Sequence, residues 1–276
     1  MKHKRNKTVG VALGGGAARG GAHIGILEAF DAAGVKIDYI SGTSIGACIA
    51  ALYAFGVPFA EMKRIFSGIK WKHVSDFRFS KFGFFSNEEI GNIARDAIGD
   101  VLIEDADIPL GIVACDVATG KQITFTRGRL AEIIMASTSL PGLFKPVIYD
   151  DLMLVDGAIV ENVPISALKT MGADLTVACD LSASREYDRP HNVLDVVINS
   201  FDIAIEMTTI MQVREADIHM PLNMTQFSRS EIADLESLIE AGRTQSVPYI
   251  EALKNRLAKP PPQKLWKRIV PNWFRS

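Results

Sequence analysis

The sequence predicts an α/β fold in which a largely parallel sheet is covered by helices on both faces. Across the first two thirds of the chain, short apolar segments with strand character alternate with longer helical segments, as in consecutive βαβ units. Residues 39–60 carry no charged side chain, but serine, glycine and proline interrupt this run. A buried strand, a turn and a buried helix therefore explain it better than a transmembrane helix.

Composition supports one large domain, or at most two. The 276 residues are 48% hydrophobic and 22% charged, which is enough apolar material for a sizeable core. The formal net charge is -2, so the overall balance attracts neither nucleic acid nor an anionic membrane. The three cysteines are far apart and form no CxxC spacing, which argues against disulfides and a zinc site and favours a reducing cytoplasm. We predict no metal, no other cofactor and no nucleic-acid partner.

The first strand is expected at residues 8–13 and the next at residues 36–41. Between them, a glycine turn leads into a helix over residues 23–33, which Gly34 ends. A further helix follows Ser44. It is apolar on nearly every side, as expected for a central buried helix.

Two later strands, at residues 108–117 and 122–126, are expected to form a hairpin. Residues 152–155 then form a strand that leads into a helix ending at Gly172 and into a strand over residues 175–179. We interpret this last part as another βαβ unit.

The pattern is helical after about residue 182, with long segments over residues 192–215 and 231–257. No break in composition marks a second domain. The predicted divisions are a basic N-terminal tail at residues 1–7, one folded domain at 8–258 and a proline-rich, basic and aromatic tail at 259–276. Within the domain, all the motifs described below lie in residues 8–182, and residues 183–258 form the helical part.

Three short motifs each follow a predicted strand. "LGGGAARG" follows the first strand, "GTSIG" follows the second, and "VDGA" follows a later one. Because the carboxyl ends of parallel strands share one edge of an open sheet, where ligands bind, we expect the three motifs to converge on one crevice.

The second motif predicts a nucleophilic serine. Ser44 would sit on a sharp strand-to-helix turn, where Gly42 and Gly46 remove side chains that would collide around it. Its position at a helix N-terminus also favours developing negative charge. Ordinary turns and helix N-caps show the same five-residue pattern, so alone it does not separate a nucleophile from a structural serine.

The first motif predicts a concave set of backbone N–H donors at Gly14, Gly15 and Gly16, which suits an oxyanion. A competing interpretation is the dinucleotide-binding turn of an oxidoreductase. Its GxGxxG spacing fails here because Arg19 occupies the third glycine position and Gly20 follows it. Arg19 itself has two interpretations: it contacts a phosphate group or it clamps the loop.

A nucleophilic serine needs a base within hydrogen-bond reach. No histidine of the sequence lies in a recognisable motif, and His23, one helical turn after Arg19, is better explained as structural. Asp156 stands at a strand end before Gly157, and its apolar neighbours in "LMLVDGAIV" would raise its basicity. An aspartate in such a turn is also common as an Asx-turn residue, so this motif alone leaves both roles open.

The combination and order of the three motifs resemble the patatin-like phospholipase family. The matching residues are Gly14-Gly15-Gly16-Ala17-Ala18-Arg19-Gly20, then Gly42-Thr43-Ser44-Ile45-Gly46, then Asp156-Gly157-Ala158. Further likeness lies in "ACDVATGKQITFTRG", "ASTSLPGLFKPV" and "ENVPISALKTMGAD". The resemblance runs from about residue 8 to residue 180 and is closest to the bacterial, stand-alone members.

This resemblance implies a three-layer α/β/α sandwich with a mostly parallel central sheet, in a patatin-like hydrolase domain at residues 8–258. It implies hydrolysis of a lipid acyl ester through an acyl-serine intermediate, without a metal. In the implied dyad, Ser44 is the nucleophile and Asp156 is the base. The implied oxyanion hole consists of the N–H groups of Gly14, Gly15, Gly16 and Ile45, supported by Arg19, Gly20, Gly42, Gly46 and Gly157.

Two segments are candidates for lipid contact. The aromatic loop at residues 71–85 either flanks an acyl channel or packs on the core as a flap. The basic and aromatic residues 264–276 either lie on the inner membrane surface or dock on the protein's own body or on a second subunit. A peripheral membrane location and a homo-oligomer are therefore both open. A regulatory or scaffold protein with a weak or vestigial site is the alternative to an enzyme.

Overall fold

The computed structural model of this chain describes residues 7–68, 88–183, 187, 189–191, 193–228 and 234–258. Its centre is one sheet. The strands are β1 (Val9–Leu13), β2 (Tyr39–Thr43), β3 (Leu110–Asp116), β4 (Lys121–Phe125), β5 (Val147–Tyr149), β6 (Leu152–Asp156), β7 (Leu175–Asp180) and β8 (Ile218–Pro221). The α-helices are α1 (Gly21–Ala32), α2 (Ile45–Ala54), α3 (Phe59–Gly68), α5 (Glu88–Ile98), α6 (Leu130–Ser137), α7 (Ala158–Glu161), α8 (Ile165–Met171), α9 (Val193–Gln212) and α10 (Leu235–Ala258). Short 3-10 helices are η1 (Ala17–Gly20), η2 (Ile103–Asp105) and η3 (Val213–Glu215).

The sheet joins a parallel part to an antiparallel part. Its order is β5-β6-β3-β2-β1-β7-β8, with β4 also paired to β3. Strands β3, β2, β1, β7 and β8 run parallel, whereas β4 and β6 are antiparallel to β3, and β5 is antiparallel to β6. The predicted α/β class, its mostly parallel sheet and the β3–β4 hairpin are confirmed.

One predicted connection is wrong. The strand-helix-strand pattern of residues 152–179 predicts a βαβ unit, but β3, β2 and β1 separate β6 from β7 in the sheet, and β6 runs the other way. A hairpin causes the reversal, because β5 and β6 meet at Asp150 and Asp151, whose φ angles are 46° and 62°. Two consecutive positive φ values are typical of a tight type I′ turn. Strand β5 escaped prediction because Asp-Asp lacks the glycine that usually marks this turn.

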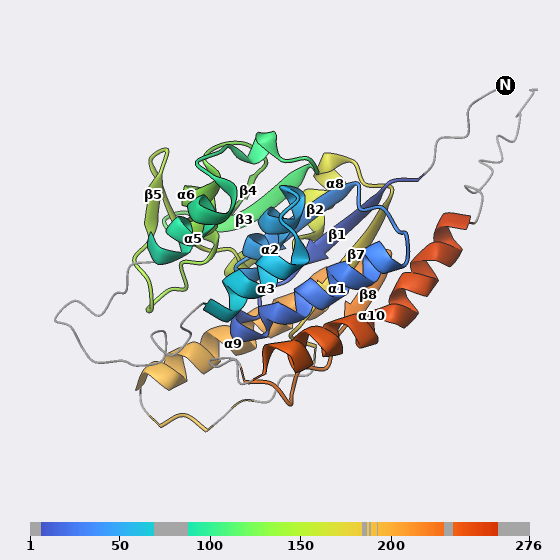
Figure 1. Ribbon diagram of the computed structural model, residues 1–276. Helices are drawn as coiled ribbons and strands as arrows, with labels where there is room; N and C mark the ends of the chain where they lie inside the picture. The colour runs from blue at the N-terminus through green and yellow to red at the C-terminus, as the bar shows by residue number, and fades with distance from the viewer. Residues whose placement is uncertain are drawn as a thin grey trace, which may run out of the picture.

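Helices cover both faces of the parallel part. Val11 and Leu13 of β1 belong to the main core cluster, which also holds the apolar side chains of α1, α2 and α10. Ala12, between them, belongs to a second cluster with Leu168 of α8. Since alternate residues of a strand point to opposite faces, both faces of β1 are buried. Figure 1 shows α1, α2 and α10 on the near side of the sheet. This part is the three-layer arrangement that the resemblance implies.

Helices α1 and α10 lie side by side with their backbones in contact (Figure 1). A Cβ on Gly25 of α1 would lie 1.9 Å from the carbonyl oxygen of Ile239, and one on Gly242 of α10 would lie 2.0 Å from that of Ala22. The predicted helices over residues 192–215 and 231–257 are confirmed in outline as α9 and α10. Strand β8 between them was missed, because its four residues are too few for a clear alternating pattern.

Several predicted features lie outside the described residues. These are the N-terminal tail except Lys7, the aromatic loop at 71–85 and the C-terminal tail at 259–276, including the membrane candidate at 264–276. The division into a domain at 8–258 with two tails stays a prediction.

Candidate active site

Ser44 lies on the turn between β2 and α2, in a backbone conformation that residues other than glycine rarely adopt. Its φ is 56° and its ψ is -128°, a strained combination that costs about 1–3 kcal/mol and is common at functional sites. Two glycines permit the turn: a Cβ on Gly42 would lie 2.4 Å from the oxygen of Gly46, and one on Gly46 would lie 2.2 Å from that of Leu13. The motif therefore forms the strand-turn-helix geometry expected of it.

Asp156 meets Ser44 at this turn. Ser44 Oγ donates a hydrogen bond of 2.6 Å to Asp156 Oδ2, and the backbone N–H of Ala158 donates one of 2.9 Å to Oδ1. Asp156 is buried, with 2% of its surface exposed, whereas Ser44 is half-buried. Among the candidate bases that the structure describes, Asp156 is the one that contacts the Ser44 hydroxyl.

The register of two strand pairs brings these residues together. Asp156 pairs with Ala114 of β3, and Thr43, next to Ser44, pairs with Val113. Because β6 is antiparallel to β3, its carboxyl end points back into the sheet and reaches the level at which β2 ends. The motifs converge as predicted, but Asp156 lies at the end of an antiparallel strand and not at the shared edge of the parallel strands.

Burial raises the pKa of Asp156 from its usual value to about 6. The hydrogen bonds from Ser44 and Ala158 act to lower this pKa, and the charge of Asp202 on α9 acts to raise it. The apolar surroundings thus shift the pKa in the direction predicted from the sequence. A carboxylate with a pKa near neutrality is a stronger base than an ordinary aspartate and is still largely ionised at pH 7.

Ser137, at the end of α6, fixes the Ser44 backbone and was not identified from the sequence. The Ser44 N–H donates a 2.9 Å hydrogen bond to Ser137 Oγ, which donates in turn to the carbonyl oxygen of Val113 at 2.7 Å. The only hint was the position of Ser137 inside the "ASTSLPG" stretch. Because the Ser137 hydroxyl bonds two backbone groups, we assign Ser137 a positioning role.

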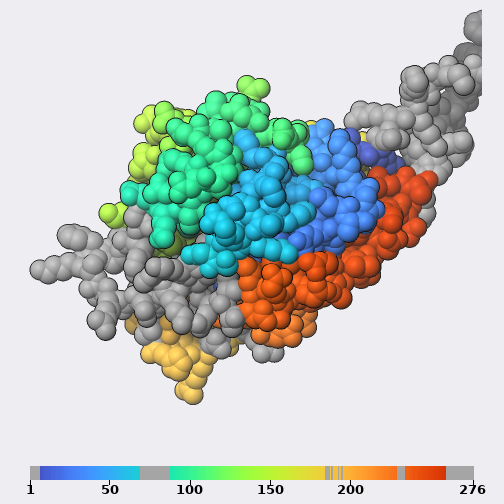
Figure 2. Space-filling view, in the orientation of Figure 1, coloured from blue at the N-terminus to red at the C-terminus, as the bar shows by residue number. Residues whose placement is uncertain are grey.

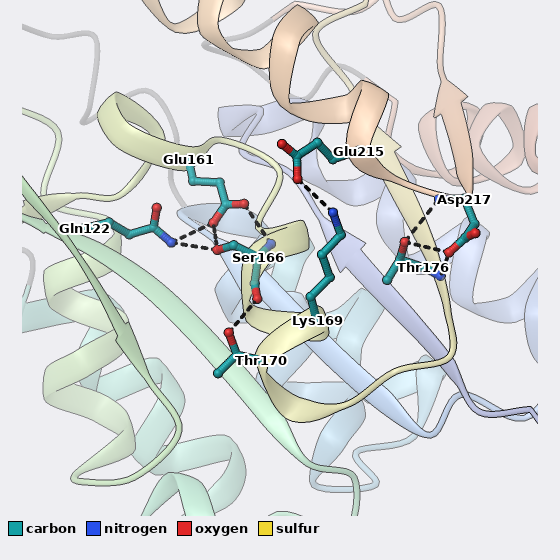
Figure 3. Close-up of polar contacts among 8 residues, drawn as sticks. All are labelled: Gln122, Glu161, Ser166, Lys169, Thr170, Thr176, Glu215 and Asp217. Atoms are coloured by element: carbon teal, nitrogen blue, oxygen red, sulfur yellow. Dashed lines mark hydrogen bonds and ion pairs between the residues drawn. The ribbon is translucent and has the colours of Figure 1, made fainter.

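Residues after Asp156 are tied to β2 as well. Thr43 Oγ1 donates to the carbonyl oxygen of Glu161, and Ser41 Oγ donates to that of Pro164. The Glu161 carboxylate accepts hydrogen bonds from the Ser166 N–H and hydroxyl and from the Gln122 amide, as Figure 3 shows. These contacts hold α7 and the start of α8 against β2 and β4, and so keep the Asp156 segment beside the serine turn.

The glycine loop lies against Ser44, but only part of it is free to bind a ligand. The Gly14 N–H donates to the oxygen of Cys179 at 3.1 Å, and the Gly15 N–H donates to both the backbone and the side-chain oxygen of Asn162 at 3.2 Å. Among the described residues, the N–H groups of Gly16 and Ile45 have no acceptor. Asn162 was also missed as a supporting residue, although it lies in the quoted "ENVPIS" stretch.

The remaining predicted glycines are packing positions. Gly20 lies against the side chain of Ile45, and Gly157 lies against the backbone of Val113. Arg19 is buried, and its Nε donates a 2.9 Å hydrogen bond to the carbonyl oxygen of Phe227. Of its two interpretations, this contact favours the clamp on the loop.

His23 bonds the backbone of the glycine loop and does not contact Ser44. Its Nε2 donates to the carbonyl oxygen of Gly14 at 2.7 Å, and its Nδ1 is buried without a partner. Burial lowers the pKa of His23 to about 4, so the ring is neutral at pH 7 and Nδ1 carries no proton. His219 of β8 lies 3.3 Å from Asp180 and also has no contact with Ser44. His3 and His73 lie outside the described residues.

A scan against family models matches residues 11–169 to the patatin-like phospholipase family. The chain belongs to this family. The matched span covers more than half of the chain and contains Ser44, Asp156 and the glycine loop. It also contains Ser137 and Asn162, so the supporting contacts lie within the patatin-like region.

Relatives of the chain are found among curated proteins. An uncharacterised NTE family protein of Mycobacterium tuberculosis is 36% identical over 178 residues, which is 64% of this chain and 49% of that protein. A protein named lysophospholipase NTE1, from Pyricularia oryzae, is 33% identical over 183 residues, which is 64% of this chain and 12% of that protein. The chain thus spans about half of the mycobacterial relative and a small part of the much longer fungal one.

Solved structures share the patatin-like fold. VipD of Legionella pneumophila matches 90% of this chain and 67% of its own with a TM-score of 0.54 and 14% identity. ExoU of Pseudomonas aeruginosa, in its complex with SpcU, matches 93% of this chain and 53% of its own with a TM-score of 0.52 and 17% identity. At these identities the likeness concerns the fold alone.

Proposed function

We propose that this patatin-like chain is a serine acyl hydrolase that cleaves carboxylic esters of lipids through a Ser44–Asp156 dyad. The observation that carries the proposal is the 2.6 Å hydrogen bond from Ser44 Oγ to a buried carboxylate whose pKa is about 6. Lipid esters are the proposed substrate class because of the family match and the relative named as a lysophospholipase. The same match leaves the oxidoreductase alternative without support.

In the proposed first step, Ser44 Oγ attacks the ester carbonyl carbon while Asp156 Oδ2 accepts the hydroxyl proton. The carbonyl π bond opens and its oxygen becomes an oxyanion. When this intermediate collapses, the bond from carbon to the alkoxy oxygen breaks, and Asp156 returns the proton to the leaving alcohol. The acyl group then remains on Ser44 as an ester.

In the proposed second step, a water molecule attacks the acyl-serine carbonyl and Asp156 accepts one of its protons. Collapse of this second intermediate breaks the bond to Ser44 Oγ, which takes the proton back from Asp156. The fatty acid leaves and the dyad returns to its starting state. His23 stands outside this cycle, because it is neutral and bonded to Gly14.

We propose that the Gly16 and Ile45 N–H groups stabilise the oxyanion. Both lack an acceptor among the described residues, and Ile45 is the first residue of α2, where the helix dipole adds positive potential. Gly14 and Gly15, which the resemblance includes in the oxyanion hole, use their N–H groups to hold the loop. Their proposed role is therefore to orient the loop.

The proposal is tested by covalent labelling together with turnover. The wild type and Ser44→Ala would be treated with a fluorophosphonate that carries an alkyl chain, and hydrolysis would be measured with p-nitrophenyl esters of increasing acyl length. We expect a single phosphonylated peptide containing Ser44, and a loss of turnover of at least about 10⁴-fold in Ser44→Ala.

Ser67→Ala is the matched control, because Ser67 is an exposed serine whose hydroxyl donates a hydrogen bond to the Arg64 carbonyl oxygen on its own helix. It should label and turn over like the wild type. The proposed activity would be rejected if labelling persisted in Ser44→Ala. It would also be rejected if a folded wild type hydrolysed no ester in the series and no phospholipid. In that case, a regulatory or scaffold protein on this fold would be the better description.

A further inference from the structure

Helix α9 presents an uncharged, largely apolar face to solvent. Three of its side chains are among the most exposed apolar groups of the described residues: Val193 at 82%, Met207 at 62% and Met211 at 70%. The side chains of this helix that the structure describes as exposed, up to Met211, are Val193, Val196, Val197, Ser200, Ile203, Ala204, Met207, Thr208, Ile210 and Met211. They recur in steps of three and four, so they form one continuous face.

The opposite face of α9 is buried and carries polar groups. Asp202, Ile205 and Thr209 are buried, and the Gln212 amide donates to the carbonyl oxygen of Val160 in α7 at 2.6 Å. The polarity is thus inverted relative to an ordinary surface helix, whose charged residues point to water. A continuous exposed apolar face of this kind reaches the size of the largest patch on a typical monomer, and such patches often serve as contact surfaces.

This face lies on the outer side of a helix that borders the active site. Helix α9 packs against α7, which begins two residues after Asp156, and the Asp202 charge acts on the Asp156 carboxyl. Figure 2 shows the gold atoms of this region protruding from the lower margin of the molecule. Whatever contacts α9 is therefore brought close to the proposed dyad.

By length and composition alone, residues Asp195–Glu215 could cross a membrane, although 22% of an 18-residue window within this segment is buried in the protein. Crossing conflicts with the packing, since Asp202, Thr209 and the Gln212 contact fix one whole side of the helix to the protein body. A helix held in this way can lie in the plane of an interface, with only its free face in contact with lipid.

We propose that the exposed face of α9 docks the protein onto the surface of a lipid bilayer, a role that rests on the proposed hydrolysis of lipid esters. A bilayer fits this face better than a second copy of the chain does. The face is about 27 Å long and about 10 Å wide, or about 300 Å², whereas a stable protein interface buries about 800 Å² per partner. It also offers no exposed charge that would recognise a nucleic acid or a charged peptide.

The test compares two double variants that each add two negative charges at exposed apolar positions. Met207→Glu/Met211→Glu changes the α9 face. Ile148→Glu/Met153→Glu changes a cross-strand pair on the β5–β6 hairpin, whose exposures are 66% and 43%. Each full-length protein is mixed with phosphatidylcholine vesicles, and the bound fraction is measured by flotation.

We expect the α9 variant to lose at least tenfold in vesicle binding and the hairpin variant to bind like the wild type. With phosphatidylcholine in the vesicles as substrate, the α9 variant should show a higher apparent KM and an unchanged kcat. All three proteins should hydrolyse a soluble butyrate ester equally, which also shows that they are folded.

Equal flotation of the α9 variant and the wild type would overturn the proposal, as would equal losses in both double variants. Light scattering tests whether a second copy of the chain covers the face instead. A dimeric wild type and a monomeric α9 variant, with no vesicle binding by either protein, would assign the face to a second copy. Flotation needs no turnover and is repeated on the Ser44→Ala protein. If the wild type hydrolyses no ester but still floats through α9, the proposed activity fails and the docking surface stands.

Discussion

Asp156 and Asp180 both lie buried at the end of a strand, but their pKa values are shifted in opposite directions. Each ends a strand, β6 or β7, and each is almost fully buried, at 2% and 3% exposure. Each also accepts a hydrogen bond from the backbone N–H two residues later, that of Ala158 or of Ser182. Yet the pKa of Asp156 is raised to about 6, and the pKa of Asp180 is lowered.

The neighbours of the two carboxylates account for this difference. Burial acts to raise both pKa values, but hydrogen bonds from His219 and from the N–H and hydroxyl of Ser182 outweigh it at Asp180. Asp156 has fewer donors and feels the negative charge of Asp202. Few donors leave a buried carboxylate with a raised pKa, as the proposed base requires, whereas a larger set of donors stabilises the ionised form and lowers the pKa.

The largest expected effect that separates the two residues is on turnover. Asp156→Asn should reduce kcat/KM on a soluble butyrate ester by about 10³-fold or more, because the proton of Ser44 would lose its acceptor. Asp180→Asn should stay within about tenfold of the wild type, because Asp180 does not contact Ser44. Steady-state rates measure both. Similar losses of kcat/KM in the two variants would show that the two aspartates do not differ in the way proposed.

A pH profile should separate them next. If Asp156 is the base, kcat/KM of the wild type should fall as the pH drops below about 6, by about tenfold per pH unit once the carboxyl is mostly protonated. Asp180→Asn should retain this midpoint. A midpoint near 4 would instead follow the titration of His23 and would argue against Asp156 as the titrating group.

The stabilities should change in opposite directions. The folded pKa of Asp156 lies above its unfolded value, so the stability linked to its proton is present below pH 3.8 and lost as the pH rises through about 6. Asp156→Asn should therefore stabilise the protein at pH 8, by up to about 3 kcal/mol for a shift of about two pH units.

Asp180 reverses that sign. Its folded pKa is lowered, so its stabilising effect is present above the unfolded pKa and is lost as the pH falls through the folded one. Asp180→Asn should lower the Tm at pH 8, and Asp156→Asn should raise it. Scanning calorimetry at pH 8 and pH 5 measures both, and the gain in Asp156→Asn should shrink at pH 5. Two Tm changes of the same sign would contradict the assignment.

The smallest expected effect concerns Asp202, whose charge adds to the effect of burial in raising the pKa of Asp156. Asp202→Asn removes a negative charge that disfavours ionisation of Asp156, so the acid midpoint of the rate profile should move to lower pH. Asp195→Asn, at a less buried position on the same helix, is the control and should leave the midpoint in place. An upward shift in Asp202→Asn would show that this residue acts through something other than its charge.

The sequence predicts the parts of the site that depend on neighbouring residues. The serine turn is one, because Gly42 and Gly46 relieve local collisions that any strand-to-helix turn of this kind would meet. The position of Asp156 is different: its partner lies 112 residues away, and the contact requires an antiparallel strand that the local pattern predicts as part of a parallel unit. The expectation that Asp156 is the partner of Ser44 came from the resemblance to the family, because the local pattern leaves the role of Asp156 open.

The supporting contacts were out of reach for the same reason. Ser137 holds a residue 93 positions away, and Asn162 holds one 147 positions away, so neither has a local signature. The occupied N–H groups of Gly14 and Gly15 likewise depend on β7 and on the residue after α7. A glycine run indicates that donors can be close to a ligand, but tertiary contacts decide which of them are free.

The contact between Arg19 and Phe227 has a consequence for biosynthesis. These residues are 208 positions apart, and α1, which follows Arg19, also packs along α10. At translation rates of about 5–20 residues per second, the glycine loop waits roughly 10–40 s for its partner to be made. A nascent chain therefore contains the proposed nucleophile well before the last contact that holds the loop can form, so we expect the proposed activity to appear only once the late part of the chain has folded.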